Sequence, residues 1–259
     1  MTIRVVVAGA TGWTGSALVA AIGASDDLAL AGAVARNHGG ATLGGVTVTA
    51  TLAEALAAPS DVVVDYTHPR AVKEHTMLAL AEGRHVIIGT SGLSAADYRE
   101  IDTAARQARL GVIAAGNFSI TATLLTRFAA EAAKYVADVE IVDYASAEKP
   151  DVPSGTAREI AERIAAVRRQ PSAVAAADIL GPKEARGAAI GEGIPVPVHS
   201  LRLPSYVIAC EAIFGAPDER LTIRHDAGSS AAPYVAGTLL AVRRVGGLIG
   251  LTRGLDSLI

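Results

Sequence analysis

Short runs of apolar, mostly β-branched residues alternate with segments of helical composition through the first half of the chain. The runs are Val5 to Ala8, Leu28 to Ala35, Val46 to Val48, Val62 to Asp65, His85 to Ile88 and Val112 to Ala114. The segments Thr14 to Ile22, Ala71 to Glu82 and Ala95 to Arg109 predict helices, the last opened by a capping box of Ser94 and Asp97. Because the runs are continuously apolar, we expect parallel strands covered on both faces. The pattern predicts an α/β fold whose N-terminal part is a Rossmann-type, doubly wound parallel sheet.

After Asn117 the hydrophobic pattern changes. It predicts helices over Thr121 to Tyr135, Gly155 to Arg168 and Ala232 to Val245, and strands over Val139 to Ala145, His199 to Leu203, Tyr206 to Phe214 and Arg220 to Arg224. The segment Pro171 to Pro197 has no clear period and predicts a long loop. Strands that follow one another without helices between them predict a second, α+β domain on a mixed or antiparallel sheet. We expect this second domain over residues 120–228.

Composition narrows the class of protein. The 259 residues are 51% hydrophobic and 19% charged, which excludes a disordered chain, and the net charge of −3 argues against a nucleic-acid partner. The single cysteine, Cys210, cannot close an intrachain disulfide or build a thiolate metal site, so we expect no metal. Because we find neither a secretory signal nor an uninterrupted apolar stretch of about 18 residues, we expect a cytoplasmic protein without a membrane partner.

A glycine-rich segment follows the first predicted strand and opens the first predicted helix. Its sequence is Gly9-Ala-Thr11-Gly12-Trp13-Thr14-Gly15. Glycines allow a tight turn and close approach of the backbone to a pyrophosphate, whose charge is met by amides at the helix N-terminus. The spacing G-x-x-G-x-x-G differs from the commonest dinucleotide fingerprint, but its place between strand and helix predicts a nucleotide-binding loop.

The end of the second predicted strand selects the cofactor in such folds. An acidic residue there binds the ribose 2′-hydroxyl of NAD(H), and an arginine accommodates the 2′-phosphate of NADP(H). Here the strand runs into Ala35-Arg36-Asn37-His38 and carries no acid. Arg36 therefore favours NADPH, and NADH remains open as an alternative.

A second candidate site precedes the helix predicted from Gly155. Lys149 and the turn Ser154-Gly155-Thr156 place a cation, two hydroxyls and three backbone amides at a helix N-terminus, a combination that binds carboxylate or phosphate. Thr156 and Glu159 have capping-box spacing. A well-capped surface helix without a ligand is an equally valid interpretation of these residues alone.

Six segments together resemble the 4-hydroxy-tetrahydrodipicolinate (dihydrodipicolinate) reductases over nearly the whole chain. They are the glycine loop, Asp65-Tyr-Thr-His-Pro69, Gly89-Thr90-Ser91-Gly92, Gly116-Asn117-Phe118-Ser119, Lys149 to Thr156 and His199 to Leu203. The resemblance implies that Gly89 to Ser91 and Gly116 to Phe118 hold the nicotinamide. It also implies that Lys149 with Ser154 to Thr156 holds substrate carboxylates, and that residues 120–228 form the substrate-binding and oligomerisation domain of a homotetramer. Residues 229–259 would return to the dinucleotide-binding domain of residues 1–119.

One departure from the family matters for the chemistry. The family places two histidines shortly before the lysine, the first usually taken as proton donor, where this chain has Ala145 and Ser146. Either another group supplies the proton or the substrate differs, and His199 and His225 are candidates for the first alternative. A substrate already protonated on nitrogen needs hydride more than it needs a protein acid.

The leading hypothesis is an NADPH-dependent reductase of a carboxylated cyclic imine, with Lys149 as carboxylate ligand and candidate catalytic residue. The lysine-pathway substrate and a different carboxylated imine both stay open, as does a non-catalytic NADPH-binding regulator. A semialdehyde dehydrogenase would need an activated cysteine, and Cys210 lies in an apolar strand-like run that offers nothing to lower its pKa.

Overall fold

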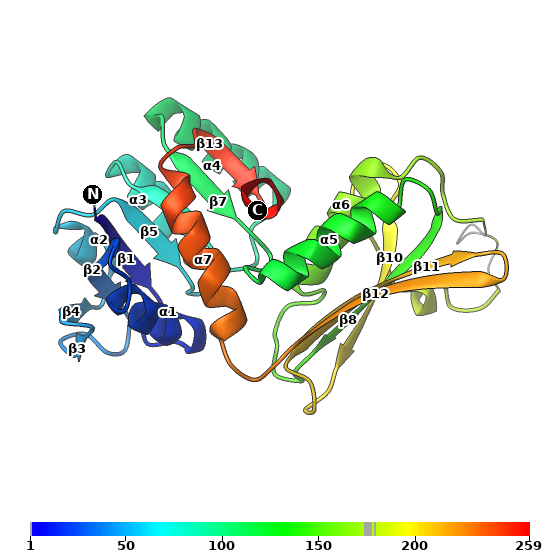
Figure 1. Ribbon diagram of the computed structural model, residues 1–259, viewed down its shortest axis with the longest axis horizontal. Coiled ribbons are helices and arrows are strands. Elements are labelled where there is room, and N and C mark those ends of the chain that lie inside the picture. Colours follow the sequence, from blue (N-terminus) through cyan, green and yellow to red (C-terminus); the bar gives the residue numbers. More distant parts are fainter. Residues whose placement is uncertain (1, 174–177, 179) are drawn as a thin grey trace. The chain divides into compact units, whose positions relative to one another are not determined.

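The computed structural model describes residues 2–173, 178 and 180–259 (Figure 1). The chain divides into two compact units, the first formed by Met1–Ile120 with Ala231–Ile259 and the second by Thr121–Ser230. No helix in the described part is both long enough and apolar enough to span a membrane.

The first unit is built on an eight-stranded sheet in the order β13-β7-β6-β5-β1-β2-β4-β3. The strands are β1 (Ile3–Ala8), β2 (Leu28–Val34), β3 (Thr42–Leu43), β4 (Val46–Thr49), β5 (Val62–Asp65), β6 (His85–Ile88), β7 (Gly111–Ala114) and β13 (Gly250–Arg253). All neighbours pair in parallel except β3 and β4. The expected Rossmann-type parallel sheet is confirmed.

Helices cover both faces of this sheet, because its strands bury side chains in both directions. The helices are α1 (Trp13–Gly23), α2 (Leu52–Leu56), α3 (Val72–Ala81), α4 (Ala95–Ala108) and α7 (Ala232–Val245). In β1, Val5 and Val7 belong to one buried cluster, whereas Val6 belongs to a second cluster on the other face. Continuous apolar strands therefore do correspond to a doubly covered sheet. The capping box of Ser94 and Asp97 is also confirmed at the start of α4.

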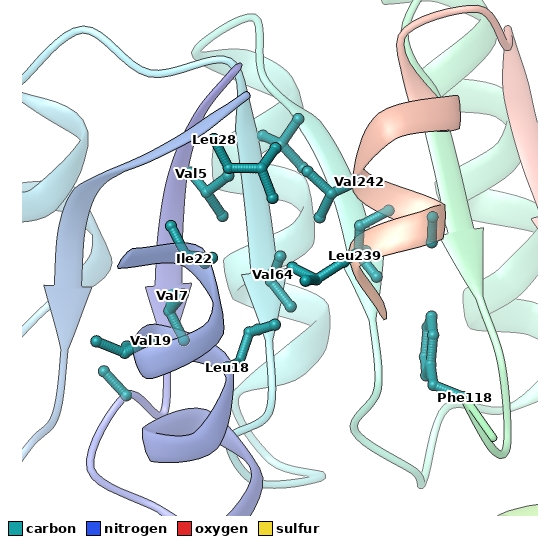
Figure 2. Close-up of a cluster of buried hydrophobic side chains, with 14 of the residues drawn as sticks. Val5, Val7, Leu18, Val19, Ile22, Leu28, Val64, Phe118, Leu239 and Val242 are labelled. Carbon is teal, nitrogen blue, oxygen red and sulfur yellow. The ribbon is translucent and has the colours of Figure 1, made fainter. Parts of the chain in front are cut away.

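The C-terminal segment packs in the first unit. Leu239 and Val242 of α7 lie in the same buried cluster as Val64 of β5 and Leu18 of α1 (Figure 2). The chain then adds β13 in parallel beside β7.

The second unit is built on a five-stranded mixed sheet in the order β12-β11-β8-β10-β9. The strands are β8 (Asp138–Ala145), β9 (Ala188–Ile190), β10 (Val196–Arg202), β11 (Ile208–Ala216) and β12 (Glu219–Ala227). Strands β8 and β10 are parallel, and the other neighbours are antiparallel. The helices α5 (Ile120–Ala132) and α6 (Gly155–Val167) pack against one face, where Ile141, Val198 and Phe214 join Ile160 in a buried core. The predicted second α+β domain is confirmed.

The prediction of a loop from Pro171 to Pro197 is wrong in part. The segment contains a 3₁₀ helix, Lys183–Arg186, the strand β9 and the first residues of β10. The three residues of β9 lack the buried alternation that identifies a strand, because it is an edge strand paired only with β10. Residues 174–177 and 179 of that segment lie outside the described part. Strands β3 and β13 and helix α2 were not predicted, although α2 opens with a capping box of Thr51 and Glu54.

The packing of α7 predicts that Gly237 tolerates no side chain. A Cβ at Gly237 would lie 1.9 Å from the carbonyl oxygen of Phe118, a backbone atom that cannot move aside cheaply. Gly237→Ala should destabilise the first unit by about 3 kcal/mol. The measurement is urea unfolding followed by fluorescence of Trp13, the single tryptophan, which contacts Tyr234 of α7.

Gly246→Ala is the matched control at the end of the same helix. Its Cβ would meet only His85 Nε2, at 4.0 Å, so a change within about 0.5 kcal/mol is expected. Equal midpoints for wild type and Gly237→Ala would contradict the packing of α7 against the Phe118 backbone.

Candidate functional site

The glycine loop connects β1 to α1 in a conformation that only glycine fits. Gly9 has φ +83°, and a Cβ there would lie 2.1 Å from the carbonyl oxygen of Tyr66. A Cβ at Gly15 would lie 2.0 Å from the carbonyl oxygen of Gly9, so the first turn of α1 sits directly against the loop. The first amides of α1, like those of any helix, have no intrahelical acceptor, and the N-cap Gly12 has no side chain to cap them. These residues fit a pyrophosphate at the helix N-terminus.

Arg36 and His38 follow β2 in an exposed turn. His38 Nδ1 lies 3.4 Å from Thr11 Oγ1, which places the turn beside the glycine loop. Trp13, half-exposed, stacks edge-on against Tyr234, with ring centroids 5.6 Å apart. The predicted nucleotide residues from Gly9 to Thr14 and the turn of Arg36 therefore lie at one end of the sheet.

The predicted nicotinamide residues gather around Tyr66, which we had not predicted as a site residue. A Cβ at Gly89 would lie 2.2 Å from the Tyr66 ring, and Phe118 packs edge-on against it at 6.0 Å. Tyr66 Oη lies 2.7 Å from Thr238 Oγ1, which itself donates to the carbonyl oxygen of Tyr234. The Tyr66 hydroxyl is therefore the donor of that bond, and burial raises the pKa of its phenol.

The remaining loop residues are fixed by local bonds. Thr90 is almost fully buried, Ser91 follows it half-buried, and Asn117 accepts a hydrogen bond from the Ser119 amide through Oδ1 at 2.8 Å. Gly116 connects the end of the β7 segment to this turn. Unit 1 thus brings together the loops that follow β1, β5, β6 and β7 at the carboxyl ends of the strands, where open α/β sheets bind ligands.

In the second unit, the turn before α6 is fixed by a buried carboxylate. Asp143 Oδ2 accepts from the Ser154 amide at 2.8 Å, from Arg202 Nη2 at 2.9 Å and from Ser200 Oγ at 3.1 Å. Arg202 also donates to the carbonyl oxygen of Asp151 at 2.8 Å. Because removing either partner would leave a charge buried and unpaired, Asp143 and Arg202 hold the turn in one conformation.

Two details of the predicted anion site are corrected. The N-cap of α6 is Ser154, whose Oγ accepts from the Ala157 amide at 3.2 Å, so the predicted capping box of Thr156 and Glu159 is misplaced by two residues. The Ser154 amide donates to Asp143 and does not point outward. Gly155, half-buried, is the first helical residue and keeps an amide without an intrahelical acceptor, whereas Thr156 is almost fully buried.

Lys149 lies at the entrance to the same turn. Its Nζ forms an ion pair with Asp151 Oδ1 at 2.7 Å, and both side chains are about three-quarters buried. Three atoms beside the turn, Arg202 Nε, Asp151 Oδ2 and Asp143 Oδ1, are buried without a hydrogen-bond partner in the described part of the chain. The turn therefore has unused donors and acceptors that a polar ligand can satisfy.

The two faces of the mixed sheet separate the candidate histidines. Asp143 and Ala145 of β8 point to the helix-covered face, and Ala145 is fully buried there. His199 points to the opposite face, where its Nε2 lies 2.8 Å from Glu140 Oε2. His225 pairs with Cys210, which in turn pairs with Asp143, so His225 shares the face of Asp143 two strands away, and burial lowers its pKa. The geometry disfavours His199 as a replacement acid for the turn.

Cys210 lies in an apolar environment that does not activate its thiol, as the sequence predicts. Its side chain is buried in the core of the second unit, and burial raises the pKa of its thiol. Such a thiol is a poor nucleophile, which removes the basis for a semialdehyde dehydrogenase. In the described part of the chain, no group of three or more His, Cys, Asp or Glu side chains is arranged to hold a metal ion.

Both halves of the chain match one protein family. Residues 3–118 match the family described as "Dihydrodipicolinate reductase, N-terminus", and residues 121–255 match "Dihydrodipicolinate reductase, C-terminus". The chain is 40% identical to the 4-hydroxy-tetrahydrodipicolinate reductase of Nocardia farcinica, covering 99% of this chain and 98% of that protein. It is 37% identical to the enzyme of the same name from Desulfitobacterium hafniense, with 98% of each chain covered.

Solved structures agree with the sequence comparison. A dihydrodipicolinate reductase from a Paenisporosarcina species, with dipicolinate bound, has a TM-score of 0.78 and 30% identity, with all of each chain covered. GenD2 from gentamicin A biosynthesis, in complex with NAD, has a TM-score of 0.68 at 18% identity, covering 94% of this chain and 86% of that one. The second likeness concerns the fold alone.

Proposed function

The chain belongs to the dihydrodipicolinate reductase family, and from this membership we propose that it transfers hydride from NADPH to 4-hydroxy-tetrahydrodipicolinate in lysine and diaminopimelate biosynthesis. The observation that carries the proposal is the turn from Lys149 to Thr156, which is held in place by Asp143 and keeps unused hydrogen-bonding atoms beside a cation. A chain that had lost its activity would be under no constraint to keep such a turn.

We propose that unit 1 binds the cofactor. The glycine loop with Thr11, Trp13 and Thr14 holds the pyrophosphate, and Arg36 holds the 2′-phosphate, which makes NADPH the preferred cofactor over NADH. The segments Gly89 to Ser91 and Gly116 to Phe118 hold the nicotinamide, which supplies the hydride when bound. The support is that these loops meet around Tyr66.

We propose that unit 2 binds the substrate. The Lys149 ammonium binds a substrate carboxylate, which either replaces Asp151 as its ion-pair partner or joins it. The Gly155 amide at the start of α6 adds a second hydrogen-bond donor. Thr156 and Ser154 shape the turn, Ser154 as the helix cap. The ammonium of Lys149, which lies beside this turn, is also the candidate proton donor.

The proton step is where this chain departs from its family. Ala145 has no proton to donate, and the half-buried Ser146 follows the end of β8. A substrate whose nitrogen is already protonated needs only hydride and a carboxylate ligand. The same departure favours a second candidate function, reduction of a different carboxylated cyclic imine by the same residues.

We further propose that the protein is a homotetramer formed through the second unit. The face of its sheet opposite α5 and α6 carries Tyr144, Arg224 and the exposed Leu201. Arg224 lies 4.9 Å from the centre of the Tyr144 ring, so this face presents both apolar and charged groups for another subunit.

The proposal for Arg36 predicts a preference for NADPH. Loss of a charge-assisted phosphate contact costs about 1.5 to 3 kcal/mol, so Arg36→Ala should weaken NADPH binding roughly ten- to hundredfold. NADH affinity should change little, because NADH has no 2′-phosphate. Fluorescence titration measures both, with Arg99→Ala on the exposed side of α4 as the control for a lost positive charge. Equal affinities of the wild type for the two cofactors would refute the assignment.

The missing histidines predict slow turnover of the family substrate. General acid catalysis contributes about 10²- to 10⁴-fold, so wild type should be active but weak, and the variant Ala145→His, Ser146→His should be faster. Because Ala145 is fully buried, the single variant Ser146→His is tested beside it. The substrate is made in situ by an aldol-condensing synthase, NADPH loss is followed, and the Nocardia farcinica enzyme serves as the reference.

Wild-type activity equal to that of the reference would show that another group donates the proton and that no acid is missing. If NADPH binds but no variant is active, the family substrate is wrong, and a panel of cyclic imino acids distinguishes the second candidate function from a regulator.

A further inference from the structure

A fully buried carboxylate lies at the end of β5, where the strand meets the predicted nicotinamide loops. Asp65 Oδ1 accepts from Thr67 Oγ1 at 2.7 Å, from the Thr67 amide at 3.0 Å and from Thr90 Oγ1 at 2.6 Å. Its other oxygen, Oδ2, lies 2.7 Å from His75 Nδ1. Asp65 is 0% exposed, so its charge depends entirely on these donors.

Within the described residues, His75 is the single hydrogen-bond partner of the second carboxylate oxygen, Oδ2. An ionised carboxylate only accepts hydrogen bonds, so Nδ1 of His75 carries the proton and donates it. The imidazole stands on α3, is 20% exposed and comes from a segment outside both loops. It therefore fixes the orientation of the Asp65 carboxylate, and with it the position of Oδ1.

Oδ1 of Asp65 connects two loops. Thr67 belongs to the loop after β5, Thr90 to the loop after β6, and the Thr67 amide also donates to Thr90 Oγ1 at 2.8 Å. The loops touch again where Gly89 meets the Tyr66 ring. A rotation of the Asp65 carboxylate would break the bonds to both threonines at once.

We propose that His75 is a positioning residue for the nicotinamide half of the cofactor site, acting through Asp65 on Thr67 and Thr90. It touches neither cofactor nor substrate. The inference rests on the proposed function only in assigning Gly89 to Ser91 to the nicotinamide. It adds a residue on α3 that controls how those loops receive the ring.

The test removes the donor and then restores it. His75→Leu fills the space without a donor, His75→Asn places an amide N–H close to the position of Nδ1–H, and His75→Gln carries its amide one bond too far along the side chain. Each variant is titrated by fluorescence competition with NADPH and with 2′-phospho-ADP-ribose, which lacks the nicotinamide. Thermal unfolding and kcat are measured in parallel.

His75→Leu and His75→Gln should bind NADPH about tenfold more weakly and lose kcat, whereas their affinity for 2′-phospho-ADP-ribose should stay within about twofold of wild type. His75→Asn should recover most of the NADPH affinity. If His75→Leu does not fold, His75→Gln still allows the comparison of NADPH with 2′-phospho-ADP-ribose, because a polar side chain is tolerated at this partly exposed position.

Equal losses for NADPH and 2′-phospho-ADP-ribose, or a lowered unfolding temperature with unchanged NADPH affinity, would overturn the proposal and leave His75 a structural residue. A wild type that binds NADPH but does not reduce the family substrate contradicts the proposed function alone, because the binding ratio still decides the role of His75. A wild type that binds no NADPH overturns both.

Discussion

A buried carboxylate needs hydrogen-bond donors from the protein, and in this protein two buried carboxylates determine the shape of both candidate sites. Asp65 and Asp143 are each 0% exposed, and each gathers donors from segments that are far apart in sequence. Asp65 fastens the loops after β5 and β6, and Asp143 fastens the turn before α6 to β10. Because an unpaired buried charge costs several kcal/mol, these loops are held in place before any ligand arrives.

The rest of each site is built on that arrangement. Loops held in place present backbone amides and one or two cations, so the ligands proposed for these sites would not have to order the chain on binding, which lowers the entropic cost. Gly9, Gly15 and Gly89 serve the same end by letting neighbouring segments come within contact distance. The apolar strands behind them supply a rigid support, since their alternate side chains are buried on both faces of the sheet.

The hydrophobic pattern predicted most of the fold because it reports burial directly. Strands β5 and β6 and helix α7 have the bounds expected from the sequence, whereas β9 and β3 are short edge strands whose residues are not buried in alternation. The motifs predicted the loops of both candidate sites, but not the buried carboxylates that hold these loops. The bonds from Asp143 to Ser200 and Arg202 span 57 and 59 residues, and no local pattern records such a distance. The cap of α6 was misplaced for the same reason, since Ser154 and Thr156 are equally good caps until Asp143 takes the Ser154 amide.

The central claim is that this member of the dihydrodipicolinate reductase family reduces its substrate by hydride transfer from the nicotinamide cofactor. The most direct measurement uses NADPH carrying deuterium at C4 of the nicotinamide, on one face and then on the other, with 4-hydroxy-tetrahydrodipicolinate generated in situ. The account predicts that one of the two labelled cofactors delivers a single deuterium to the reduced product, detected by mass spectrometry. Absence of labelled product from both cofactors, in a protein that binds NADPH, would contradict it.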